Sequence, residues 1–228
     1  LARSDRPRYQ IVTLYYVTTN DGKVREARAY LDRIEPVDYD YAEIQAPTLE
    51  PIAARGAREA YEVVIGGADL KSAAEDAGRR DGVIVDDAGL FVEGIGGFPG
   101  PYSAFVDNTI GIESVGELAR AELGERPRAT FRCALAYCDG AILDDTTPDG
   151  SSAAHATMAI DEAHPAVAVF SGEIEGRIVE PRGDGGFGYD PIFEHRGRTL
   201  AEMGTGDKNA ISHRGRALER FASWYDGQ

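Results

Sequence analysis

Lysine is almost absent from this chain. Of the 228 residues only Lys23, Lys71 and Lys208 are lysines, and arginine supplies the rest of the 24 basic residues. The 39 acidic residues bring the formal charge to −15. Nucleic acids and anionic membranes attract basic proteins, so this charge argues against both as partners. Abundant carboxylates with few lysines indicate a halophilic source, although an acidic mesophilic protein would also fit.

Cysteine is equally scarce, with Cys133 and Cys138 as the only two. In an extended strand their odd spacing places them on opposite faces, so we expect no disulfide between them. Two unpaired thiols fit a reducing, cytoplasmic compartment. The four histidines have no metal-ligand spacing with either cysteine, which argues against a structural zinc site.

Long hydrophobic runs are missing as well. No apolar stretch approaches the roughly 20 residues that span a bilayer, and residues 1–9 lack the apolar segment of a secretory signal. We therefore expect a soluble intracellular protein. Residues 1–9 are predicted to be a disordered tail, and 10–226 a single domain with a substantial core.

The chain opens with a strand, a polar loop and a helix. Residues 11–18 are rich in β-branched and aromatic side chains, which predicts a buried strand. The loop at 20–22 follows at the carboxyl end of that strand, where α/β sheets bind ligands, and the helix after it would offer free N–H groups to a phosphate. The apolar residues expected on one face of this helix are Val24, Ala27, Leu31 and Ile34.

The remaining pattern alternates helices and strands, which predicts an α/β fold. The predicted helices cover 49–63, 68–80, 113–123 and the C-terminal stretch. The predicted strands cover 83–85, 128–138 and 166–179. Residues 144–152 are acidic and contain glycine and serine, so they predict a mobile surface excursion.

Polar residues gather near the C-terminus more densely than a core would need. Phe187, Asp190, Lys208, His213 and Arg214 place an aromatic ring, a carboxylate, an ammonium, an imidazole and a guanidinium in one short span. The glycines on both sides of Phe187 suit a ring that is offered to a purine face. The combination indicates a site for a nucleobase and a phosphate, although an ion-pair network around the last helix is the alternative.

Asp86 and Asp87 follow the predicted strand 83–85, where it gives way to a glycine-containing turn. If the backbone stays extended, the two carboxylates point to opposite sides. We expect Asp86 to cap a turn or a neighbouring helix.

Three ordered segments resemble the inosine triphosphate pyrophosphatase family. They are Thr18-Thr19-Asn20-Asp21-Gly22-Lys23, the stretch 83–90 running into 96–104, and the C-terminal stretch 186–215. The resemblance covers nearly the whole chain. It implies an elongated mixed sheet with flanking helices that form two lobes around a central cleft, and a homodimer. With the acidic composition it suggests a halophilic archaeal source.

The family resemblance also implies roles for individual residues. Asp87 would be the general base and, with Glu43, would hold a Mg²⁺ ion. The residues that would contact substrate are Thr18, Thr19, Asn20, Lys23, Arg55, Ala88, Phe187, Gly188, Tyr189, Asp190, Lys208, His213 and Arg214. Thr19, Arg55 and Ala88 stand where the family usually has glycine, lysine and serine. These departures bear on affinity more than on the reaction.

The implied activity is hydrolysis of aberrant purine nucleoside triphosphates (ITP, dITP and XTP) to the monophosphate and pyrophosphate. Two alternatives stay open. One is a nucleotide pyrophosphatase of the Maf type, which acts on other bases. The other is a non-catalytic nucleotide sensor that has kept the pocket and lost turnover.

Overall fold

The computed structural model describes residues 10–66, 79–140, 156–158 and 167–225. The predicted tail 1–9, the predicted excursion 144–152 and most of the predicted helix 68–80 lie outside these ranges. Within them no helix is long and apolar enough to cross a membrane.

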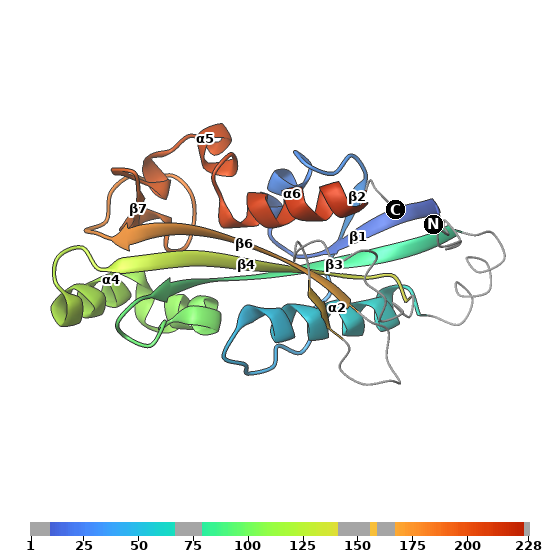
Figure 1. The fold of residues 1–228 in the computed structure, drawn as a ribbon, viewed down its shortest axis with the longest axis horizontal. Coiled ribbons are helices and arrows are strands. Elements are labelled where there is room, and N and C mark those ends of the chain that lie inside the picture. The colour runs from blue at the N-terminus through green and yellow to red at the C-terminus, as the bar shows by residue number, and fades with distance from the viewer. Residues whose placement is uncertain (1–9, 67–78, 141–155, 159–166, 226–228) are drawn as a thin grey trace, which may run out of the picture.

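Three long antiparallel strands form the frame of the molecule. They are β3 (Arg79–Val92), β4 (Arg128–Cys138) and β6 (Val167–Ile178), and Figure 1 shows them running along its long axis. The predicted strands at 128–138 and 166–179 are therefore confirmed. In the described residues the sheet has eight strands, with the order β2-β1-β3-β4-β6-β7-β8 and with β5 paired to β6.

The short strands extend the two edges of this frame. On one edge β1 (Gln10–Val17) lies parallel to β3, and β2 (Ile34–Val37) lies parallel to β1. On the other edge β7 (Phe193–His195) pairs with the end of β6, and β8 (Arg198–Thr199) pairs with β7. The short strand β5 is Ala156–Met158. Parallel and antiparallel pairs together make the mixed sheet that was expected.

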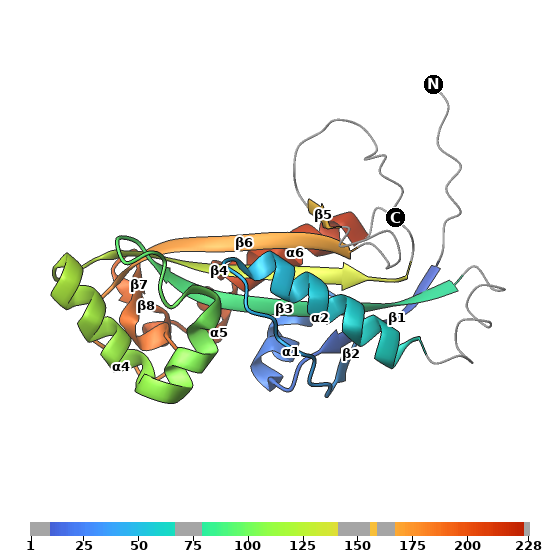
Figure 2. The ribbon, with the colours of Figure 1, turned by 90° about the horizontal axis from the view of Figure 1, so that it is seen from below.

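The described helices are α1 (Asp21–Ala27), α2 (Leu49–Val64), α4 (Ser103–Leu123), α5 (Thr205–Asn209) and α6 (His213–Tyr225), with short 3₁₀ turns η1 (Gly100–Tyr102), η2 (Asp190–Ile192) and η3 (Leu200–Glu202). Figure 1 shows α2 and α6 on opposite sides of the long strands, and Figure 2 shows α4 near the end of the strands away from α2.

Two of the predicted helices had the wrong extent. The helix after β1 ends at Ala27, and Ile34 begins β2, yet Leu31 and Ile34 are both buried. Their apolar spacing therefore reflected burial in one core and not one continuous helix. The predicted helix 113–123 is the second half of α4, which contains a break at Gly111 (φ 80°).

The sheet buries a core on each of its faces. Strand alternation sends Cys133 to the face covered by α1 and α6, and Cys138 to the face covered by α2. Both thiols are buried and unpaired, as predicted. A further cluster packs α4 against the far ends of β3, β4 and β6.

The position of Asp86 and Asp87 was mispredicted. They lie in the middle of β3 and not at the end of a strand, because β4 continues to pair with β3 as far as Val92. The parallel neighbour β1 pairs with β3 only as far as Ile84. Beyond that point β1 gives way to its loop, and the chain turns into α1 beside the two aspartates.

Gly172 allows α6 to lie close to β6. A Cβ atom there would come within 2.1 Å of the carbonyl oxygen of His213 and 2.6 Å of the backbone nitrogen of Ala217. We predict that Gly172→Ala lowers the free energy of unfolding by about 1–3 kcal/mol, as overpacking usually does. Urea unfolding measures this change. In the control Gly206→Ala nothing lies within 4 Å of the added atom, so an equal loss there would contradict the prediction.

Candidate active site

The loop between β1 and α1 is shaped by its own side chains. The Asn20 side-chain oxygen accepts hydrogen bonds from the backbone N–H groups of Gly22 (2.8 Å) and Lys23 (3.2 Å). Thr18 accepts one from the Asn20 N–H at 3.1 Å, and Thr19 is exposed. Thr18, Asn20 and Lys23 therefore lie together in this loop, as predicted. The N–H groups of Gly22 and Lys23, which were expected to be free for a phosphate, already donate to Asn20.

Asp86 lies at the centre of a buried network that links three elements to β3. Its carboxylate accepts from the Tyr16 hydroxyl at 2.5 Å and pairs with Lys23 at 3.1 Å and with Arg214 at 2.9 Å. Arg214 also pairs with Glu26 at 3.0 Å, and Glu26 accepts from the Ser212 hydroxyl. We call Tyr16, Lys23, Glu26, Asp86, Ser212 and Arg214 the buried network.

This network corrects the expectation for Asp86. Asp86 does not cap a turn, because cationic groups from two other elements surround it. Arg214 is only 4% exposed, and its guanidinium pairs with the carboxylates of Asp86 and Glu26 and lies 6.0 Å from the Phe187 ring centroid. Burial alone would raise the pKa of Asp86, but Lys23 and Arg214 outweigh burial and hold that pKa well below its usual range.

Glu26, Tyr16 and Ser212 are members that the sequence analysis missed. Glu26 lies one helical turn after Lys23, between the apolar residues Val24 and Ala27 of α1. A carboxylate flanked by buried apolar residues is the signal that could have revealed it, since a buried charge needs a partner. Tyr16 and Ser212 carried no comparable signal.

Asp87 points to the other face of β3, as the extended backbone requires. One carboxylate oxygen accepts the N–H of Ala88 at 2.9 Å, while the other is buried and has no hydrogen-bond partner. Burial raises the pKa of Asp87 to about 7, with Asp86 and Glu43 adding to the rise and Lys23 opposing it. A carboxylate of this kind can take up a proton near neutral pH.

Glu43 lies on the exposed loop before α2, near enough for its charge to act on Asp87. No group of three or more His, Cys, Asp or Glu side chains in the described residues could hold a metal ion. The carboxylates of Asp87 and Glu43, the first with an unpartnered oxygen, nevertheless suit a hard divalent cation, because Mg²⁺ keeps several waters and takes other ligands from substrate phosphates.

Phe187 is 47% exposed, as expected for a ring offered to a base. The Lys208 ammonium lies 4.4 Å from the ring centroid and 2.5 Å from the Asp190 carboxylate. The same Asp190 oxygen accepts the Phe187 N–H at 2.7 Å. Asp190, itself buried, therefore positions the ring and Lys208, and its contact with a base stays a prediction.

Glycine is required on one side of the ring. A Cβ atom on Gly186 (φ 75°) would come within 2.2 Å of the Asp190 carboxylate. Gly22, in the first turn of α1, is also close to the ring, because a Cβ atom there would lie 3.8 Å from Phe187. The aromatic side of the site and the start of α1 are therefore neighbours.

Three other predicted residues have different surroundings. Tyr189 is buried, and its hydroxyl donates to the carbonyl of Ser103 at 2.9 Å. His213 is buried against Phe131, with ring centroids 4.8 Å apart. Burial, then Arg214 and Lys208, lower its pKa well below the usual value, which keeps it neutral. Ala88 is partly buried and packs against the core.

Gly188 and Arg55 complete the predicted set. Gly188 has a φ of 55° and lies near the start of α4, where a Cβ atom would be 3.9 Å from the Asp107 carboxylate. Arg55 is exposed on α2, and none of its contacts joins it to the other site residues in the described part of the chain. Its phosphate-binding role stays a prediction.

The fold and the site define a mixed α/β protein with a carboxylate pair, an ammonium group and an exposed aromatic ring where the first strand ends. Residues 14–224 match the model of the Ham1 family. The chain belongs to this family.

The most similar relatives include two archaeal proteins, each named dITP/XTP pyrophosphatase. The one from Methanopyrus kandleri is 43% identical over 92% of this chain and 94% of its own. The one from Thermococcus kodakarensis is 41% identical over 92% and 96%. A solved HAM1 protein from Coxiella burnetii has a TM-score of 0.70 and 26% identity, covering 95% of this chain and all of its own. These matches confirm the predicted fold class and the family resemblance.

The raised pKa of Asp87 predicts how stability depends on pH in metal-free protein. The folded state disfavours the ionised carboxylate, so its cost is absent below the unfolded pKa, grows above it and is complete above about 7. Asp87→Asn removes this cost. The melting temperature of the variant in EDTA should exceed that of the wild type by more at about pH 8 than at about pH 5. An equal difference at both pH values would contradict the assignment.

Proposed function

We propose that the protein hydrolyses ITP, dITP and XTP to the nucleoside monophosphate and pyrophosphate. The observation that carries this proposal is Asp87, whose carboxylate has a buried oxygen without a partner and a pKa near neutrality. The names of the relatives support the same activity. Cleansing the nucleotide pool of aberrant purines would be the result.

Asp87 would act as the general base on water. A bond forms between the water oxygen and the α phosphorus, and the bond from that phosphorus to the α–β bridging oxygen breaks. Pyrophosphate leaves with the electron pair, and the proton passes to Asp87. A base whose pKa lies near the working pH is well matched to this step.

Asp87 and Glu43 would hold a Mg²⁺ ion. Such an ion offsets the negative charge of phosphate oxygens, which nucleotide hydrolysis requires. Lys23 is 22% exposed and is already fixed by Asp86, so it offers an oriented ammonium group to the phosphate chain without a large loss of side-chain freedom.

The base would stack on Phe187, with Lys208 beside it. A ring face accepts any purine, whereas the ammonium group only donates hydrogen bonds. The 6-oxygen of hypoxanthine or xanthine can accept such a bond, while the amino group of adenine would face a second donor. Selection between 6-oxo and 6-amino purines would thus come from Lys208.

Several attributes remain predictions that rest on the resemblance or on composition: the two-lobed cleft, the homodimer, the cytoplasmic location and the halophilic archaeal source. The Maf-type alternative is not supported, because the chain matches the Ham1 family. A non-catalytic sensor would have no need of Asp87 in its present environment.

A nucleotide panel tests the proposed reaction. With Mg²⁺ present, ITP, dITP and XTP should yield stoichiometric monophosphate and pyrophosphate, whereas ATP and dTTP should react much more slowly. Chromatography of the nucleotide and a pyrophosphate-specific assay give both products. Release of orthophosphate, or equal turnover of dTTP, would contradict the proposal.

The two aspartates should fail in different ways. Asp87→Asn should lower kcat by about 10²–10⁴-fold while the fold stays intact, because general-base catalysis contributes on that scale. Asp86→Asn should chiefly lower the melting temperature, since it leaves Lys23 and Arg214 without their shared carboxylate. Steady-state kinetics and thermal melts on both variants separate the roles, and identical behaviour of the two would refute the assignment.

Phe187 and Lys208 should affect substrates differently. Phe187→Ala should reduce kcat/KM for ITP and ATP by similar factors, because every purine has a π-face to stack. Lys208→Ala should reduce kcat/KM for ITP more, and so narrow the ITP:ATP ratio. If the ratio is unchanged in Lys208→Ala, base selection lies elsewhere.

A further inference from the structure

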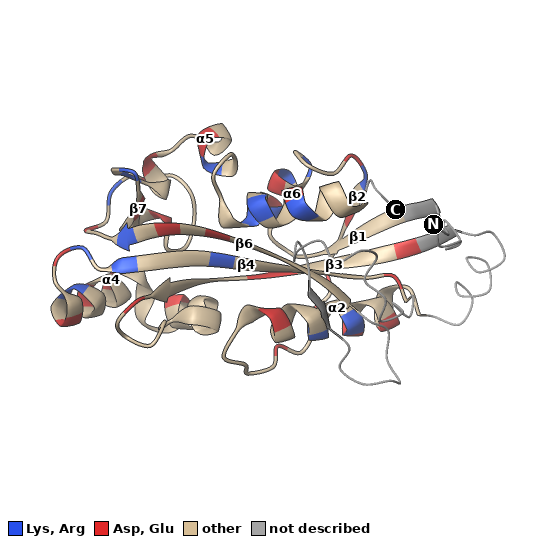
Figure 3. Cartoon of the chain, viewed as in Figure 1, with Lys and Arg blue, Asp and Glu red and all other residues tan. Residues whose placement is uncertain are grey.

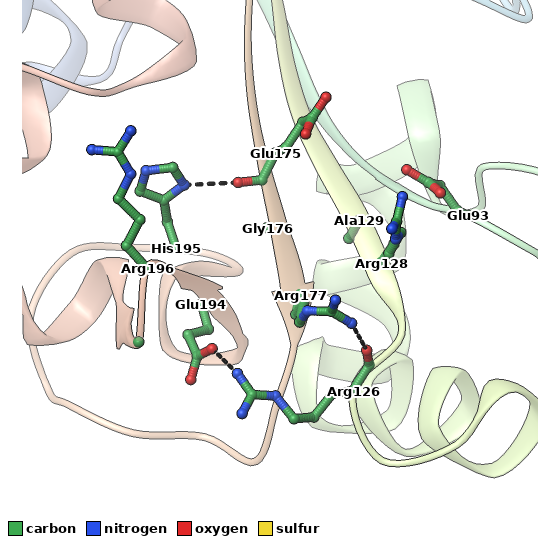
Figure 4. A pocket seen from close by; sticks show the side chains of 11 residues that line it. Glu93, Arg126, Arg128, Ala129, Glu175, Gly176, Arg177, Glu194, His195 and Arg196 are labelled. Atoms are coloured by element: carbon green, nitrogen blue, oxygen red, sulfur yellow. Dashed lines mark hydrogen bonds and ion pairs between the residues drawn. The ribbon is translucent and has the colours of Figure 1, made fainter.

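A polar pocket lies where β4, β6 and β7 meet, and it shares no residue with the candidate active site. Its volume is about 500 Å³, within the range of small-ligand sites. Figure 4 shows its lining, and Figure 3 shows Lys and Arg residues gathered at the ends of β4 and β6 there. The basic side chains that line it are Arg126, Arg128, Arg177, His195 and Arg196.

Two of these arginines are neighbours on adjacent strands. Arg128 on β4 and Arg177 on β6 are direct cross-strand partners, so their exposed side chains lie on the same face. Like charges in that arrangement destabilise a sheet. Arg177 donates to the backbone carbonyl of Arg126 at 2.9 Å, and among the described residues neither Arg128 nor Arg177 forms an ion pair with a carboxylate.

The buried acid of the pocket is already occupied. Glu194 is 6% exposed and pairs with Arg126 and with Arg182, the latter at 2.8 Å. Glu93 and Glu175 also line the pocket, but within the described ranges neither is ion-paired to its arginines. In the described part of the chain, the guanidinium groups of Arg128, Arg177 and Arg196 are therefore without a carboxylate partner.

Arg196 is held in an unfavourable backbone conformation at the edge of the pocket. It lies in the two-residue turn between His195 and Arg198, with a φ of 50°, followed by Gly197 at 87°. Asparagine or glycine suits that position, whereas a long side chain is strained there. His195 is also held in place, since its Nδ1 lies 2.8 Å from the backbone oxygen of Glu175. Because a carbonyl oxygen can only accept a hydrogen bond, Nδ1 carries the proton and donates it.

We propose that this pocket is a second anion site that binds an inorganic oligophosphate such as pyrophosphate. Guanidinium groups present paired donors that match phosphate oxygens, and a multiply charged anion would relieve the repulsion between Arg128 and Arg177. This ligand chemistry follows from the arginines and does not depend on the activity proposed above. The phosphate chain could come from free pyrophosphate or from an intact nucleotide.

Calorimetric titration of the full chain with pyrophosphate, at low salt and in EDTA, tests the proposal. Binding should persist in Lys23→Gln, which weakens the candidate active site, and the dissociation constant should rise at least about tenfold in the double variant R128Q/R177Q. Arg132→Gln is the matched control, since this arginine lies on the same face of β4 but pairs with Glu173 at 3.7 Å. Its dissociation constant should stay unchanged.

A competition titration, in which ATP is added to the protein with pyrophosphate, identifies the source of the phosphate chain. Competition by ATP would show that the pocket accepts a nucleotide tail, and its absence would restrict the site to free oligophosphate. Unaltered pyrophosphate binding in R128Q/R177Q would overturn the proposal. If R128Q/R177Q also has a smaller molecular mass than the wild type by light scattering, the pocket is instead a contact between copies of the chain.

Discussion

The buried carboxylate of Asp86 is the interaction on which the rest of the structure depends. It receives Tyr16 from β1, Lys23 from α1 and Arg214 from α6, and so fastens three elements to the middle of β3. Four charged groups lie in this network, and breaking such a buried pair typically costs about 3–5 kcal/mol. Elements far apart in sequence are therefore held in one arrangement by charge as well as by the apolar core.

The neighbouring residue gains its properties from the same arrangement. Successive residues of a strand point to opposite faces, so Asp87 is turned away from Arg214 and keeps one oxygen without a partner. One carboxylate is held strongly acidic, while the pKa of the other rises to about 7. Two adjacent acids with pKa values moved in opposite directions can take separate roles, one structural and one chemical.

The sequence was sufficient for the fold class, for the long strands β4 and β6 and for the alternation that separates Cys133 from Cys138. Motif resemblance singled out Lys23, Asp87, Phe187 and Lys208, whose roles in the site stay predictions. These features depend on local pattern, which a single chain displays directly.

Long-range contacts could not be predicted in the same way. The length of β3 depends on pairing with β4, and nothing near Asp86 in the sequence indicates that Arg214 will reach it. For the same reason nothing near Arg214 or Asp190 in the sequence indicates that Arg214 pairs with Glu26 or that Asp190 pairs with Lys208.

A double-mutant cycle on Asp86 and Arg214 tests this account most directly. The free energy of unfolding in urea would be measured for the wild type, for Asp86→Asn, for Arg214→Gln and for the double variant. If the two side chains form one buried unit, the double variant should be more stable than the sum of the single losses predicts, by about 1–3 kcal/mol. Losses that add to within about 0.5 kcal/mol would contradict the central place of this pair.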